Sequence, residues 1–183
     1  MATVLVPLAD GFEEIEAITV VDVLRRAGIE VCTAGLVSRS VTGSHAIRVE
    51  ADRTLDDVAD AHFDMIVLPG GMPGAQRLRE DERILELVRA QARRGHYTAA
   101  ICAAPSVLAA AGVLDGRTAT SYPGFLDART TPGLELSTAP VVIDGNVVTS
   151  RSAGTALDFS LALIELLAGR SVRDDVETRL QRT

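Results

Sequence analysis

The chain has 183 residues, of which 47% are hydrophobic and 23% are charged, a composition that excludes a disordered or highly charged tail protein and fits one domain over 1–183. Aromatic residues make up only 3% and tryptophan is absent, so we expect a core of Val, Leu, Ile and Ala. With 25 acidic and 18 basic residues the net charge is −7, which argues against nucleic acid as a partner, because neutralising phosphates supplies much of that affinity.

Strand-like and helix-like patterns alternate from one end of the chain to the other. In chain order we predict a strand over 4–8, a helix over about 12–27, strands over 29–34 and 64–68, a helix over 81–94, a strand over 97–101, a helix over 104–111, a hairpin over 141–148 and a helix over 155–168. Asp10 and Glu13 have the spacing of a capping box for the first helix, which Gly28 ends. Short connections between alternating elements imply a flavodoxin-like, doubly wound α/β fold, with a mostly parallel sheet and helices on both faces.

The apolar runs and the number of cysteines indicate the cellular compartment. The apolar run at 4–8 is too short for a signal peptide or a membrane span, and no later stretch reaches the roughly 18 apolar residues that a span needs. Two cysteines are too few for a disulfide framework. We therefore expect a soluble, cytoplasmic protein with no membrane partner.

The ligand crevice of a doubly wound sheet lies beyond the carboxyl ends of its strands. Cys102 stands there, where the strand over 97–101 turns directly into a helix, as in a nucleophile elbow without the letters G-x-S-x-G. A helix N-terminus favours the thiolate. The alternative is a small buried cysteine at the end of a core strand. Cys32, in the middle of an apolar strand, is most simply a core residue.

Glu16 is a second residue that breaks the local pattern. It shares a helical stripe with Val20, Val23 and Ala27, so a carboxylate lies on an apolar face. Burial there raises the pKa of a carboxyl and keeps it protonated. The alternative is a partly exposed glutamate. Glu16 and Cys102 both follow strands, so they can converge on one crevice.

Two glycines follow the strand over 64–68. Gly70 and Gly71 let backbone N–H groups face a ligand and, with the N–H of Ala103, can form an oxyanion hole for an adduct on Cys102. The alternative is that they only make a turn. No G-x-G-x-x-G or P-loop pattern occurs, so no nucleotide cofactor is predicted.

The histidines predict no metal site. His45, His62 and His96 lie in loop-like contexts, without metal-ligand spacing and without a Cys/His cluster. A surface role is the simpler interpretation for each. Neither a metal nor any other cofactor is therefore predicted.

Four segments together resemble a known family. The residues over 11–16, 67–71, 100–105 and 149–151 resemble, in order, motifs of the ThiJ/PfpI superfamily, and are most similar to the branch of the parkinsonism-associated protein deglycase and bacterial YajL. The resemblance implies a flavodoxin-like fold and a homodimer. It also implies a reactive Cys102 contacted by a protonated Glu16, with the backbone amides of Gly71 and Ala103 facing the sulfur.

One position departs from the best-studied relatives. They carry His before the proline that follows the fifth strand, whereas this chain has Tyr122 before Pro123. A tyrosine cannot replace histidine as a base near neutral pH. The departure argues against cysteine peptidase activity, and leaves Gly70, Tyr122 and Arg151 as candidates for the wall of the site.

The resemblance implies an enzyme that needs no cofactor and takes a small dicarbonyl as substrate. Glyoxalase activity converts methylglyoxal or glyoxal and water to a hydroxy acid, and deglycation of early glycated groups is a related activity. In this interpretation Cys102 is the nucleophile and Glu16 the general acid and base. The alternative, from another class, is an oxidative-stress sensor or redox-regulated chaperone that uses the same cysteine without turnover.

Overall fold

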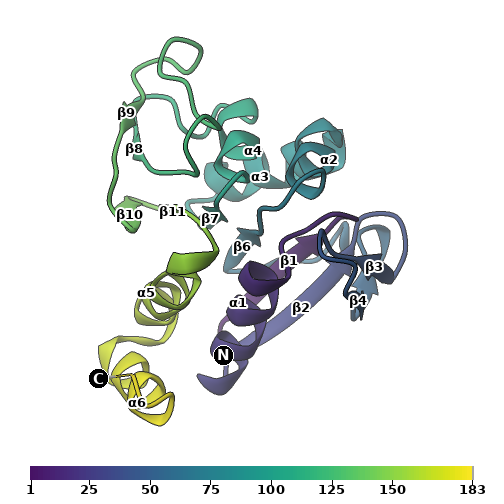
Figure 1. Ribbon diagram of the computed structural model, residues 1–183, viewed down its shortest axis with the longest axis vertical. Helices are drawn as coiled ribbons and strands as arrows, with labels where there is room; N and C mark the ends of the chain where they lie inside the picture. The colour runs from purple at the N-terminus through teal and green to yellow at the C-terminus, as the bar shows by residue number, and fades with distance from the viewer. Residues whose placement is uncertain (183) are drawn as a thin grey trace.

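The structure is a computed structural model that describes residues 1–182. The strands of its main sheet are β1 (Thr3–Leu8), β2 (Glu30–Gly35), β5 (Arg53–Thr54), β6 (Met65–Leu68), β7 (Tyr97–Ile101), β10 (Val141–Asp144) and β11 (Val147–Ser150). They lie in the order β10-β11-β7-β6-β1-β2-β5 (Figure 1). All neighbours are parallel except the antiparallel β10–β11 pair. The prediction of a mostly parallel sheet is confirmed.

Helices cover both faces of this sheet (Figure 1). They are α1 (Glu14–Arg26), α2 (Gly74–Glu80), α3 (Glu82–Arg93), α4 (Pro105–Ala110), α5 (Ala156–Ala168) and α6 (Arg170–Arg179), with the 3-10 turns η1 (Asp56–Val58) and η2 (Ala153–Thr155). On one face α1 packs beside α5, and α2, α3 and α4 cover the other. Strand β1 alternates between them, since Val4 and Val6 join the core under α1 and Leu5 joins the core under α3 and α4.

Four short strands lie outside the main sheet. Two small sheets pair β3 (Ser40–Thr42) with β4 (Arg48–Glu50), and β8 (Thr118–Ala119) with β9 (Glu135–Leu136). The second of them pairs residues directly after α4 and its following turn with residues 135–136, where no strand was predicted. Helix α2, helix α6 and the strands β3, β4, β5, β8 and β9 were not among the predicted elements. Within residues 1–182, no helix is both long and apolar enough to cross a membrane.

The predicted capping box of the first helix is wrong. Helix α1 begins at Glu14, and Glu13 stands before it without a side-chain cap. The Asp10 carboxylate instead accepts the backbone N–H of Thr42 at 2.8 Å, and so ties the turn after β1 to β3. The N–H of Glu13 donates to the carbonyl of Gly70 at 2.9 Å. Asp10 and Glu13 therefore make long-range contacts in place of a local cap, so tertiary contacts determine where α1 begins.

Candidate active site

Cys102 occupies the sharp turn between β7 and α4. Its backbone has φ 63°, a left-handed conformation that few non-glycine residues adopt. The conformation is held from both sides, because the N–H of Cys102 donates to the carbonyl of Ser150 at 3.0 Å and the N–H of Tyr122 donates to the carbonyl of Cys102 at 2.9 Å. Cys102 itself is half-buried. A strained, doubly anchored backbone thus presents the sulfur at the carboxyl end of the sheet.

Glu16 lies in the first turn of α1 and is fully buried. Its Oε2 accepts the backbone N–H of Gly70 at 2.8 Å. Its Oε1 is buried without a partner of regular hydrogen-bond geometry, and the polar side chain that acts on the carboxyl is the Cys102 thiol. The structure therefore brings together the two residues that are 86 positions apart in the sequence, and leaves one carboxyl oxygen free for chemistry.

Gly70 and Gly71 make this approach sterically feasible. A Cβ on Gly70 would lie 2.6 Å from the Cβ of Cys102 and 2.7 Å from Oε2 of Glu16, closer than real contacts. Gly71 has φ 85°, and a Cβ there would lie 2.3 Å from the backbone nitrogen of Glu13. Only glycine fits at these two positions, so the end of β6 closes directly over the thiol and the carboxyl.

The electrostatics of the pair follow from burial. Burial raises the pKa of Glu16 to about 7, although the Gly70 N–H and the Cys102 thiol both lower it. Burial, followed by the negative charge of Glu16, raises the pKa of Cys102 to about 12, against the backbone N–H groups of Gly71 and Ala103. The sequence-based expectation of a favoured thiolate is therefore wrong for the form in which Glu16 is ionised.

The effect of Glu16 on the thiol depends on its own proton. When Glu16 is protonated its charge disappears and its O–H becomes a donor, so both of its contributions that oppose the Cys102 thiolate vanish. The two groups therefore titrate as a pair that resists a second negative charge. A proton that moves between sulfur and carboxyl within such a pair never has to cross bulk solvent.

Tyr122 and Arg151 line a hollow of about 490 Å³, and neither Cys102 nor Glu16 forms part of its wall. The Tyr122 ring is 49% exposed and packs edge-to-face on Phe125, with ring centroids 6.1 Å apart. Nη1 of Arg151 donates to the carbonyl of Thr138 at 3.0 Å. Tyr122 contacts the site through its backbone N–H, and within residues 1–182 its hydroxyl makes no hydrogen bond with Cys102 or Glu16.

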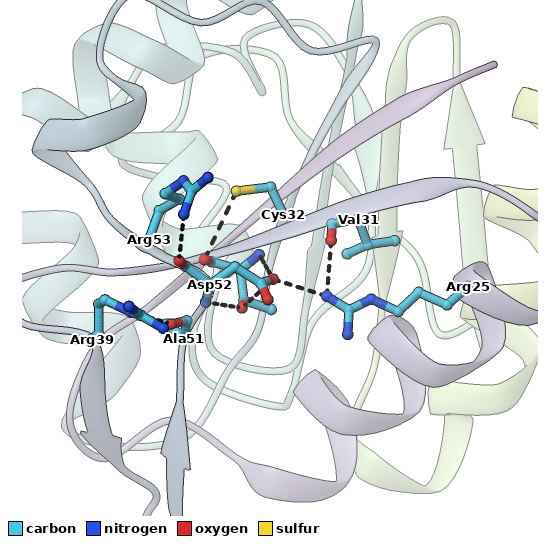
Figure 2. A network of polar contacts seen from close by, with 8 residues as sticks. Arg25, Val31, Cys32, Arg39, Ala51, Asp52 and Arg53 are labelled. Atoms are coloured by element: carbon cyan, nitrogen blue, oxygen red, sulfur yellow. Dashed lines mark hydrogen bonds and ion pairs between the residues drawn. The ribbon is translucent and has the colours of Figure 1, made fainter.

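Cys32 lies in a different environment. It is half-buried on β2, beside a polar network centred on Asp52 (Figure 2). Asp52 accepts the N–H and hydroxyl of Thr33, at 2.9 and 2.8 Å, and pairs with Arg25 at 2.8 Å. Burial and the charge of Asp52 raise the pKa of Cys32. Cys32 does not have the left-handed backbone of Cys102, and its sulfur does not lie against the buried Glu16 carboxyl.

Two anchoring residues were missed by the sequence reasoning. The carbonyl of Ser150 fixes the backbone of Cys102, and its hydroxyl lies 2.7 Å from that of Thr155, which pins the end of β11 to the start of α5. Their chain distance from Cys102 hides them. The predicted hairpin over 141–148 and the family-like residues over 149–151 pointed to this strand, but neither indicated its contact with Cys102.

Known proteins are similar to this chain over most of its length. A model of the DJ-1/PfpI family matches residues 2–166. Protein dj-1beta of Drosophila melanogaster is 43% identical over 173 residues, which cover 94% of this chain and 92% of that protein. Its crystal structure superimposes with a TM-score of 0.93 at 41% identity, covering 100% and 98% of the two chains.

Two further relatives differ in length and in name. Protein DJ-1 homolog A of Arabidopsis thaliana is 41% identical over 180 residues. These residues cover 97% of this chain but only 46% of that protein, so the chain spans about half the length of this relative. A protein named deglycase from Pyrococcus abyssi is 37% identical over 164 residues, which cover 90% of this chain and 98% of that protein. The similarity therefore includes both single-length and roughly double-length proteins.

Proposed function

The chain belongs to the DJ-1/PfpI family, and from that premise we propose that it is a cofactor-independent glyoxalase or deglycase, acting on methylglyoxal, glyoxal or early glycation adducts. The observation that carries the proposal is the elbow at Cys102, with φ 63° and its sulfur against the buried carboxyl of Glu16. The deglycase name of the Pyrococcus relative supports the same class of substrate.

The amino-acid composition supports thiol chemistry on a carbonyl substrate. All 18 basic residues of the chain are arginines, so no lysine is present to form a Schiff base with an aldehyde. Guanidinium groups stay protonated and are poor nucleophiles. Covalent addition to an aldehyde therefore falls to a thiol, and Cys102 is the thiol with a general base beside it.

The first proposed step is addition. The sulfur of Cys102 attacks the aldehyde carbon of methylglyoxal, the thiol proton passes to the Glu16 carboxylate, and the carbonyl π electrons move to oxygen. Glu16 then gives its proton to that oxygen, which completes a neutral hemithioacetal. The N–H groups of Gly71 and Ala103 stabilise the negative charge as it develops.

The second step is isomerisation followed by hydrolysis. The Glu16 carboxylate removes the hydrogen of the former aldehyde carbon as a proton, giving an enediolate. The hydroxyl proton of the first carbon moves to the negatively charged oxygen of the adjacent carbon, and Glu16 returns its own proton to that adjacent carbon. The first carbon is thereby oxidised to a thioester and the second is reduced to an alcohol, so no external oxidant is needed. Water cleaves the thioester to lactate and restores the thiol. A carboxyl with a pKa of about 7 suits both roles of Glu16.

Steady-state kinetics on three variants test this function. Purified protein is incubated with methylglyoxal and lactate is measured. We expect Cys102→Ser and Glu16→Gln to abolish lactate formation, whereas Glu16→Gln retains alkylation of Cys102 because the amide still donates a hydrogen bond. Tyr122→Phe deletes only a hydroxyl, so it is expected to reduce turnover roughly tenfold or less, the size of a typical single hydrogen bond. Near wild-type turnover in Glu16→Gln would refute the mechanism.

A redox sensor is the second candidate, and one observation favours it. Oε1 of Glu16 is buried without a regular partner beside a half-buried sulfur. A protonated Glu16 can donate from this oxygen to a cysteine sulfinate and stabilise it. One solved relative, from Toxoplasma gondii, is described as oxidised. Absence of lactate formation, together with a stable sulfinate on Cys102, would favour this function over the first.

A further inference from the structure

Glu13, Glu14, Ser44 and His45 direct four potential donor atoms at one point. Glu13 and Glu14 stand at the start of α1, and Ser44 and His45 lie in the loop between β3 and β4, about 31 residues further along the chain. One ligand atom from each of Glu13, Glu14 and His45 falls within 4.8 Å of the others. We name these three residues the Glu-Glu-His cluster.

The separations fit a shared divalent cation. Nδ1 of His45 lies 3.0 Å from Oε2 of Glu14 and 3.7 Å from Oε2 of Glu13. Two ligands about 2.1 Å from a tetrahedral zinc ion lie roughly 3.4 Å apart, which is between the two observed distances. The hydroxyl of Ser44 is 3.3 Å from both carboxylates, so it lies at the rim of the same point.

Hydrogen bonds fix the Glu14 carboxylate and the loop that carries His45 without a metal ion. Oε1 of Glu14 accepts the backbone N–H groups of His45 at 2.8 Å and Ile47 at 3.3 Å, which fixes this buried carboxylate and leaves Oε2 for the cluster. Ala46 between them has φ 65°, so the loop has one sharply defined shape. The His45 side chain is 69% exposed, so the point is reachable from solvent.

We propose that the Glu-Glu-His cluster binds one divalent transition-metal ion of the zinc type, through Oε2 of Glu13, Oε2 of Glu14 and Nδ1 of His45, with water in the fourth position. One imidazole and two carboxylates suit zinc, nickel or copper, whereas calcium needs six to eight oxygens and magnesium prefers oxygen ligands. Binding replaces the contact between Nδ1 and Glu14, so a proton on Nδ1 is released to solvent.

The alternative is a hydrogen-bonded clamp without a metal. In that case a proton on Nδ1 donates to Glu14, and the carboxylates hold the loop and nothing else. The zinc site and the clamp have the same structural contacts, so a metal titration is needed to distinguish the two. The proposal does not depend on the proposed enzyme activity, because its readout is binding.

Calorimetric titration of the chelator-treated chain with zinc chloride tests the site. We expect one zinc ion per chain, and at least a tenfold weaker association in His45→Ala and in Glu13→Gln, by analogy with the loss of a metal-site residue. Glu13→Gln is the gentler change, since within residues 1–182 the polar partners of the Glu13 side chain are Ser44 and His45. Circular dichroism confirms that each variant is folded.

Two variants serve as controls. His62→Ala removes a histidine far from the cluster in the chain, and Cys102→Ser removes the reactive thiol; both are expected to leave the zinc affinity unchanged. Three results would overturn the site: no zinc binding by the wild-type chain, undiminished binding in both cluster variants, or loss of binding in Cys102→Ser, which would assign the ion to the thiol.

Discussion

Replacing Glu16 with glutamine is expected to stabilise the fold above neutral pH. The carboxyl is fully buried and burial raises its pKa from 4.5 to about 7, so its ionised form is disfavoured in the native protein. Glutamine has the shape of the protonated carboxyl, keeps an acceptor for the Gly70 N–H and carries no charge. The substitution therefore removes the unfavourable ionisation and keeps the contact.

The sign and size of this effect follow from proton linkage. The folded pKa is higher than the unfolded one, so the contribution of Glu16 to stability is fully present below pH 4.5 and is lost as the pH rises through about 7. A shift of about 2.5 units corresponds to about 3 kcal/mol once both states are ionised, of which about 2.5 kcal/mol is lost between pH 5 and pH 8.

Urea denaturation followed by far-UV circular dichroism measures the effect, because the chain has no tryptophan. The variant's advantage in free energy of unfolding is expected to grow by about 2.5 kcal/mol from pH 5 to pH 8, in buffer with chelator. Glu14→Gln is the opposite control. Burial raises the pKa of Glu14, but hydrogen bonds from the His45 side chain and from the backbones of Glu14, His45 and Ile47 together lower it to about 2, so its replacement destabilises the fold at pH 8. An equal advantage of Glu16→Gln at both pH values would refute the reasoning.

Three further predictions concern the site and the assembly. Gly70→Ala is expected to abolish turnover and lower the melting temperature, whereas Gly154→Ala, whose Cβ would meet its nearest neighbour at 3.9 Å, leaves both unchanged. Peroxide is expected to oxidise Cys102 before Cys32, and peptide mass spectrometry showing equal modification would contradict this. Sedimentation is expected to give twice the chain mass, since the family resemblance implies a homodimer and α1 exposes apolar side chains; a monomer at micromolar concentration would contradict it.

The main elements of the fold were predictable because each carries its own local signal. The central strands are continuous apolar runs that stay apolar on both faces, and glycines mark the ends of the helices. The missed elements lack such a signal. Helix α6 buries only Val176 and consists mostly of charged residues, and β3, β4, β8 and β9 have two or three residues each. Their structure comes from contacts with the rest of the chain.

The site was predictable at the level of residues but not of interactions. Cys102, Glu16 and the two glycines each break the pattern of the element that carries them, and the sheet topology brings such positions together. The contacts of Glu14 with His45, and of Asp10 with Thr42, join segments more than 30 residues apart. No local pattern predicts them, so a first-turn acid and a loop histidine seemed unremarkable.

The pKa of Cys102 shows why composition and position are not enough to assign a reactive thiol. The helix N-terminus and two backbone amides favour the thiolate, but burial and a carboxylate act in the opposite direction and outweigh them. The reactivity of the Cys102 thiol therefore depends on whether Glu16 is protonated, and the pKa of Glu16 is about 7. A left-handed Cys102, a buried acid and glycines with no room for a Cβ each destabilise the fold locally. All of them occur at one end of the sheet, which is the pattern expected where structure is selected for chemistry.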